Sequence, residues 1–107
     1  MNTPANDDLR FVLNADQSRH EAWAGDTLAA YVEFSQLANG VLFSHTEVLP
    51  AFEGRGIGSA IARHVLDTAR AEGQPVIPAC QFIAGYIRKH REYVDLVRPE
   101  TQRAFNI

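Results

Sequence analysis

Glu53-Gly-Arg-Gly-Ile-Gly58-Ser59 is the most informative stretch of this sequence. Its three glycines stand at alternate positions, so the backbone can curl and approach a ligand without obstruction from side chains. A strand pattern precedes it and a helix pattern follows it. Several of its N–H groups are therefore expected at a helix N-terminus, where unpaired donors and the macrodipole favour an anion. Ser59 can add a hydroxyl donor and Arg55 a guanidinium, so the stretch predicts a diphosphate site; the alternative is an ordinary glycine-rich turn.

Two other phosphate-binding patterns do not fit this stretch. A P-loop places Lys and then Ser or Thr after its last glycine, whereas Gly58 precedes Ser59-Ala60 here. The dinucleotide fingerprint needs G-x-G-x-x-G and an acidic residue about 20 positions further on. This turn has the pattern G-x-G-x-G, and residues 76–80 contain no acid. Binding of NAD is therefore the weaker alternative.

The residues before the turn have strand patterns. The four segments are 10–14, 18–24, 28–35 and 41–48. In the third segment apolar residues fall on alternate positions, which indicates a half-buried strand. Asn39-Gly40 is a two-residue hairpin signal between the third and fourth segments. Together these patterns predict an antiparallel meander.

The residues after the turn change to helical spacing. We expect a helix over 58–72 that ends at Gly73, then a short strand over 76–80, then a helix over 82–90. A further helical turn is expected over 92–97. This order is an α/β arrangement, in which the late strand lies parallel to an earlier one and is joined to it by a right-handed crossover.

The bulk composition describes one small globular domain. The chain has 107 residues, of which 46% are hydrophobic and 21% charged, and this length leaves little room for a second domain. We expect the domain to span residues 9–98, with a flexible tail over 1–8 and a C-terminal tail over 99–107. Because the core is modest, a large cofactor would have to lie in a surface groove.

Charge and cysteine content exclude several classes of protein. The net charge is −3 and no basic stripe is present, so nucleic acid is not an expected partner. Cys80 is the single cysteine, which excludes an internal disulfide and fits a reducing compartment. No metal site is predicted, because His45, His64 and His90 fall on different elements. Without a signal peptide pattern or an apolar run near the roughly 20 residues of a membrane span, we expect a cytoplasmic protein with no membrane partner.

The turn and its surroundings resemble a known family. Glu53-Gly-Arg-Gly-Ile-Gly58 resembles the Gln/Arg-x-x-Gly-x-Gly/Ala signature of the GNAT superfamily of N-acetyltransferases. The wider pattern is similar to a minimal, short-chain branch of it, and its parts are His45-Thr-Glu-Val48, Pro78-Ala-Cys80, Tyr86-Ile-Arg-Lys-His90, Glu92-Tyr93 and Asp95-Leu96. The resemblance covers about residues 10–98. It departs from the superfamily at Glu53, where Gln or Arg is usual, and in lacking the substrate-binding helices of larger members.

The resemblance implies a GNAT-like α/β fold, with a mixed, mostly antiparallel sheet and two main helices after the glycine turn. It also implies transfer of acetyl from acetyl-CoA to an amine of a small molecule or a protein. In such folds the diphosphate of coenzyme A lies on the turn, and the pantetheine arm runs along the strand that ends near Val48. The residues implied to bind the cofactor are Glu47, Val48, Gly54, Arg55, Gly56, Ile57, Gly58, Ser59 and Tyr86.

Four side chains are candidates for the chemistry. His45 is the best candidate for a general base, because it lies on the strand that feeds the site and histidine exchanges protons near neutral pH. Glu47 lies two residues further on the same face and is either a base or solvated. Cys80 is a proton donor to the leaving thiol, an acyl-accepting nucleophile or a core residue. Tyr86 is either a proton donor or a core residue, and the Val48 N–H is a candidate donor to the oxyanion.

Several alternatives stay open from the sequence alone. His45 is either the general base or an ordinary histidine on a sheet face. Lys89 and His90 either contact the phosphates of the cofactor or are solvated. A non-catalytic module that binds acyl-CoA would need the same turn. A small interaction protein would use the turn for structure only.

Overall fold

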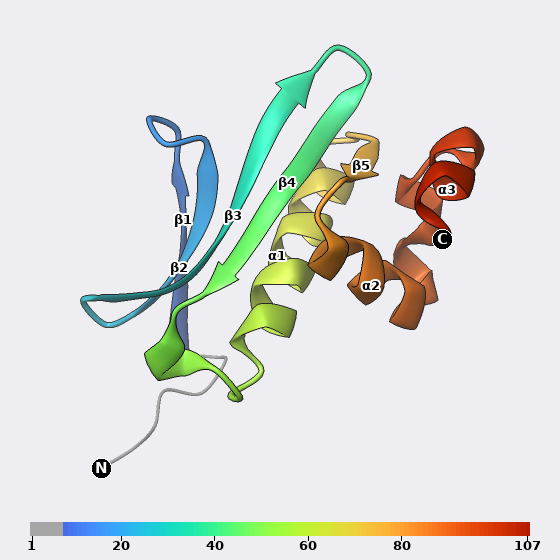
Figure 1. Ribbon diagram of the computed structural model, residues 1–107. Coiled ribbons are helices and arrows are strands. Elements are labelled where there is room, and N and C mark those ends of the chain that lie inside the picture. Colours follow the sequence, from blue (N-terminus) through green and yellow to red (C-terminus); the bar gives the residue numbers. More distant parts are fainter. Residues whose placement is uncertain (1–7) are drawn as a thin grey trace.

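The computed structural model describes residues 8–107, which form a five-stranded sheet with helices packed beside it (Figure 1). The elements in chain order are β1 (Leu9–Asn14), β2 (Arg19–Ala24), β3 (Thr27–Leu37), β4 (Gly40–Val48), the 3-10 helix η2 (Pro50–Phe52), α1 (Ile57–Ala71), β5 (Val76–Pro78), α2 (Gln81–Lys89), the 3-10 helix η3 (Arg91–Leu96) and α3 (Pro99–Phe105). Strands β1 to β4 are antiparallel neighbours and β5 lies parallel to β4. The predicted meander, the parallel fifth strand and the two helices after the turn are confirmed.

The core lies between α1 and one face of the sheet. Helix α1 buries its apolar stripe, including Ile61 and Leu66, against β2, β3 and β4. Ala30 and Val32 of β3 are fully buried on the facing side. Each large side chain of this kind contributes about 1.5–3 kcal/mol when it is removed from water. This packing fixes the direction of α1 and therefore the position of the glycine turn at its N-terminus.

The hairpin between β3 and β4 differs from the sequence expectation by one residue. Leu37 pairs with Gly40, so the two turn residues are Ala38 and Asn39, and Gly40 is the first residue of β4. Gly40 has φ of 140°, and an added Cβ would lie 2.4 Å from the carbonyl oxygen of Pro75. The glycine therefore permits the close approach of the segment before β5 and does not supply the turn conformation.

The C-terminal residues 99–107 form a docked helix instead of the expected tail. Pro99 stands in the first turn of α3, where its missing N–H costs no helical hydrogen bond. The Arg88 guanidinium donates to the carbonyl oxygens of Phe105 and Asn106 at 2.7 and 2.9 Å. The tail expected over residues 1–8 lies outside the described residues apart from Asp8. None of the described helices is long and apolar enough to cross a membrane.

Acid is expected to destabilise the fold through His20 of β2. The His20 ring packs 5.1 Å from the Phe34 ring, and burial, followed by the neighbouring His64, lowers the pKa of His20 to about 4. The unfolded chain binds the proton near pH 6.5, so folding stability is complete above that pH and is lost as the pH falls toward 4. Allowing for partial solvent contact, we expect a loss of about 2 kcal/mol in the free energy of unfolding between pH 7 and 4.5.

Urea denaturation at a series of pH values measures this loss. His20→Gln keeps a polar side chain of similar size that does not titrate. The free energy of unfolding of this variant should therefore change less between pH 7 and 4.5. An identical slope in the variant would show that other groups cause the acid sensitivity.

Candidate functional site

The glycine turn joins η2 to α1 and is open on its outer side. Gly54 has φ of 79° and Gly56 has φ of 76°, both in the left-handed region that favours glycine. An added Cβ on Gly54 would meet no atom within 4 Å. Gly56 is the N-cap residue of α1, and no side chain caps this helix end. The first amide groups of α1 therefore have no side-chain partner at this helix end.

Aromatic side chains lie on both sides of the turn. The Arg55 guanidinium carbon is 5.4 Å from the centre of the Phe52 ring, which holds this cation beside η2. On the other side, an added Cβ on Gly58 would lie 2.8 Å from Cζ of Phe82. Gly58 therefore allows the Phe82 ring of α2 to rest directly on the first turn of α1. Phe82 remains 43% exposed there instead of joining the core.

A pocket of about 220 Å³ lies between the first turn of α1 and the outer side of α2. Its lining residues are Ser59, Gln81, Phe82, Gly85, Tyr86, Lys89 and His90. Ser59 and Tyr86, two of the residues assigned to cofactor binding on sequence, thus come together at one site. The volume is below the roughly 300–1,000 Å³ of sites that enclose a whole drug-sized ligand. It suits one part of an extended ligand whose remainder lies along the surface.

Tyr86 is both a buried residue and a pocket residue. Its ring stacks on His90 at 3.9 Å between ring centres, and its side chain is 8% exposed. Burial raises the pKa of Tyr86, while nearby Arg63 acts in the opposite direction without cancelling the effect. The hydroxyl is therefore protonated near neutral pH.

The pairing of β4 with β5 stops early and leaves one edge of β4 open. The last pair is Phe43 with Pro78, and the Cys80 N–H then donates to the Phe43 carbonyl oxygen at 2.8 Å. Beyond this point the chain turns into α2, while β4 continues as far as Val48. Because proline has no N–H to donate, Pro78 marks the end of the ladder. In the described chain, residues 44–48 therefore have a partner strand on one edge only.

Cys80 lies at this opening and is buried, with 7% of its surface exposed. Its Sγ donates to Oγ1 of Thr46 at 3.1 Å. Cys80 is also the N-cap residue of α2. The thiol thus links β4 to the start of α2 at the point where β4 and β5 separate. This position is consistent with each of the three predicted roles of Cys80.

A β-bulge in β4 places His45 and Glu47 on the face of the sheet opposite α1. Phe43 faces α1 and is buried, so simple alternation would put His45 on the same side. The register of β4 against β3 shifts by one residue after Phe43, and Ser44 is the extra residue. Thr46 consequently occupies the side toward α1.

His45 and Glu47 form a half-exposed hydrogen-bonded pair. His45 Nε2 lies 3.0 Å from Oε1 of Glu47, and the two side chains are 50% and 44% exposed. With Nε2–H donating to the carboxylate, Nδ1 is the nitrogen left to accept a proton. The pair therefore has the arrangement of a base with an orienting carboxylate.

The predicted residues thus fall into three groups around the end of β4. Ser59, directly after the turn, and Tyr86 line the pocket, Cys80 lies at the strand opening, and His45 with Glu47 lies on the opposite face. His45 and Cys80 make no direct contact in the structure. Val48 pairs with Ala30 at the end of β4.

Sequence reasoning missed two residues near the site. Nothing in the sequence marks Thr46, because the bulge that turns it toward Cys80 contains no glycine or other signal. Phe82 has the spacing of the buried residues of its helix, so its spacing does not identify it as a residue of the site. The alternate glycines could have suggested a ring packed against Gly58, since a glycine inside a helix often marks a close approach.

The fold and this site define a class of protein. The sheet is mostly antiparallel, and its fourth strand leads through a glycine turn into a helix. A parallel fifth strand separates from the fourth. This arrangement is the GNAT-like α/β fold. The family model of the GCN5-related N-acetyl-transferases matches residues 19–96 of the 107-residue chain. The chain therefore belongs to the GCN5-related N-acetyltransferase family, which indicates acetyl transfer in general. Among curated proteins no match to the chain was found.

Proposed function

We propose that this protein transfers acetyl from acetyl-CoA to an amine. The observation that carries the proposal is the uncapped N-terminus of α1 behind an open glycine turn, next to the open edge of β4. Backbone donors at a helix N-terminus suit the diphosphate of coenzyme A. The turn and the strand opening are separate places along the chain, so a long, thin ligand would reach both better than a compact one.

The residues present fit coenzyme A. The amide groups of Ile57, Gly58 and Ser59 would hold the diphosphate, with the Ser59 hydroxyl adding a donor. Lys89 and the Tyr86 hydroxyl line the adjoining pocket and supply further donors. Glu53 is exposed and does not line the pocket, so its charge need not face a phosphate. The open edge of β4 at Glu47 and Val48 would offer backbone groups to the amide-bearing pantetheine arm.

The His45–Glu47 pair would remove the proton of the amine, and this deprotonation is the main energetic barrier to the reaction. A lysine-like amine is mostly protonated at pH 7, and removing its proton costs about 4.6 kcal/mol. In the proposed step, His45 Nδ1 takes one proton from the ammonium group, and the neutral amine nitrogen then bonds to the thioester carbon. The C–S bond breaks, the attacking nitrogen gives up a second proton to the thiolate of coenzyme A as it leaves, and His45 releases its proton to solvent. Glu47 would orient the imidazole and stabilise its charged form.

Cys80 has two possible roles in this scheme. It lies at the strand opening, where its thiol could protonate the departing thiolate. As a nucleophile it would first take the acetyl group as a thioester and then pass it to the amine. Mass spectrometry of the protein after incubation with acetyl-CoA distinguishes the two, because only the nucleophile role forms an acetylated Cys80.

Coenzyme A is expected to raise the thermal midpoint strongly. A ligand at a hundred times its Kd adds about 2.7 kcal/mol, which for a domain of this size corresponds to about 10 °C or more. NAD and ATP carry similar phosphates and serve as controls in parallel thermal scans. In amide NMR spectra, coenzyme A should shift Gly54 to Ser59. A midpoint raised by NAD or ATP but not by coenzyme A would contradict the proposal.

Turnover distinguishes an enzyme from the alternative, a non-catalytic module that binds acyl-CoA. Release of free thiol from acetyl-CoA is measured with a panel of small amines and a lysine-containing peptide. Amine-dependent release supports the enzyme. Tight binding of coenzyme A with no release above the buffer rate for any amine would favour the binding module.

A further inference from the structure

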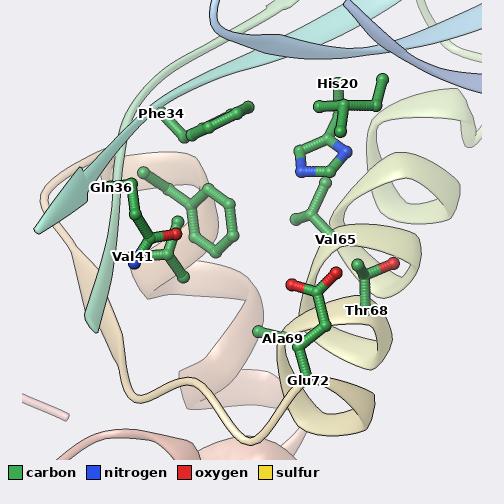
Figure 2. A pocket seen from close by; sticks show the side chains of 10 residues that line it. His20, Phe34, Gln36, Val41, Val65, Thr68, Ala69 and Glu72 are labelled. Carbon is green, nitrogen blue, oxygen red and sulfur yellow. The ribbon is translucent and has the colours of Figure 1, made fainter. Parts of the chain in front are cut away.

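A second pocket lies at the opposite end of α1, between that helix and the sheet (Figure 2). Its volume is about 120 Å³. Ser59 at the first pocket and Glu72 at this one are separated by about 20 Å of helix. The two pockets share no lining residue. The second pocket is therefore a separate feature, and nothing in the proposed acetyl transfer uses it.

The walls of this pocket are apolar and partly aromatic. Phe34 and Phe43 come from adjacent strands, and Val41 and Val65 complete the walls from β4 and α1 (Figure 2). Phe43 and Val65 are each 1% exposed, so this part of the wall is held in place by the core. An apolar cavity of about 150 Å³ can bind benzene. A cavity of 120 Å³ with an open mouth suits a body of about five heavy atoms.

The polar groups around the pocket are neutral or negatively charged, and the Thr68 hydroxyl is both a donor and an acceptor. Figure 2 shows the Glu72 carboxylate directed from the end of α1 into the space beneath His20. Glu72 forms no ion pair within residues 8–107. The Gln36 amide NH₂ is already used, because it donates to backbone carbonyls and to Gln74 Oε1 at 2.9 Å. No lysine or arginine lines the pocket. An anionic ligand would therefore meet a carboxylate and find no cation.

His20 adds a neutral acceptor to the upper wall. Burial, and then the nearby His64, lowers the pKa of His20 to about 4, so the imidazole is uncharged at neutral pH. It therefore does not repel a cation and presents one nitrogen lone pair. Within the described chain, His20 contacts aromatic rings and makes no hydrogen bond through its side chain.

We propose that this pocket binds a compact organic cation with an apolar body, of the size of a small branched primary alkylamine. The apolar body lies against Phe34, Phe43 and Val65, and the ammonium group lies at the mouth beside Glu72. The aromatic rings favour a cation for the same electrostatic reason as the carboxylate does. Because such a ligand bridges α1 and the sheet, its binding also stabilises the fold.

Three probes of one shape and different charge test the proposal: isobutylamine, isobutanol and isobutyrate. In amide NMR titrations of the full chain, isobutylamine should shift Val41, Val65 and Ala69 saturably. An exposed ion pair contributes up to about 1 kcal/mol, so the amine should bind about fivefold more tightly than the alcohol. Isobutyrate should cause no saturable shift at these positions.

Three variants make the result specific. Glu72→Gln keeps the size of the side chain and should bring the amine to the affinity of the alcohol. Glu100→Gln removes the same charge from α3, away from the pocket, and should leave amine binding unchanged. Ala69→Leu fills the pocket from α1 and should abolish the shifts. The dispersion of each spectrum shows whether the variant is folded.

Three results would overturn the proposal. Equal affinity for amine and alcohol would show an apolar cavity without charge selection. Shifts confined to the glycine turn and α2 would show that amines bind at the first pocket instead. Absence of any saturable shift up to tens of millimolar in the folded wild-type protein would show that the second pocket binds no such ligand.

Discussion

Replacing His45 with glutamine is expected to lower kcat/KM for acetyl transfer by about 10²–10⁴-fold, the usual contribution of a general base. Glutamine retains a polar side chain of similar reach but cannot accept the proton of the amine. His45 is half exposed, so the thermal midpoint should change little. Steady-state kinetics and a thermal scan of the same variant measure both effects.

Two neighbouring carboxylates provide matched controls for this result. Glu33 pairs directly with His45 across the sheet, so Glu33→Gln removes a charge from the same face without touching the imidazole contact. It should retain nearly full activity. Glu47→Gln removes the group that orients His45 and should cause an intermediate loss. A kcat/KM of His45→Gln within about threefold of the wild-type value would show that His45 is not the general base. The Cys80→Ala variant would then be the next to compare with the wild type.

The parts of the fold that followed from the sequence are those fixed by local chemistry. Gly54 and Gly56 adopt backbone angles that favour glycine, so the turn could be located from residue type alone. Gly73, with φ of 67°, ends the long helix for the same reason. The apolar spacing of α1 and the alternation in β3 reflect which face each buries. These features required no knowledge of contacts between distant residues.

The parts that the sequence did not reveal depend on long-range register. Ser44 has no property that identifies it as a bulge, yet the shift it causes places Thr46 beside Cys80 and turns His45 to the other face. The Asn39-Gly40 pair matched a common hairpin signal, but the approach of Pro75 determined where the glycine stands. The tail expected over residues 99–107 is a helix instead, and Pro99 begins it, because proline is well suited to the first turn of a helix.

Gly40→Ala is expected to produce the largest loss of stability of any small substitution proposed for this chain. The added methyl group would lie 2.4 Å from the Pro75 carbonyl oxygen, which is backbone and cannot rotate away. That carbonyl accepts the Val41 N–H at 2.9 Å, so relieving the clash would pull the start of β5 from β4. Overpacking together with the unfavourable φ should cost about 3 kcal/mol or more. For a domain of this size that corresponds to a fall of roughly 12–24 °C in Tm.

Gly25→Ala is a control that adds a methyl group at a positive φ without a clash. Gly25 has φ of 62°, and an added Cβ there would meet no atom within 4 Å. Its substitution should therefore cost only the penalty of the left-handed region, about 1–2 kcal/mol. Calorimetry of the two variants beside the wild type gives the difference, which measures the clash with Pro75 together with the additional backbone strain of φ near 140° at Gly40. Equal losses in the two variants would mean that the Pro75 segment moves aside freely. In that case, the separation of β4 and β5, on which the opening at Cys80 depends, would not be fixed by this contact.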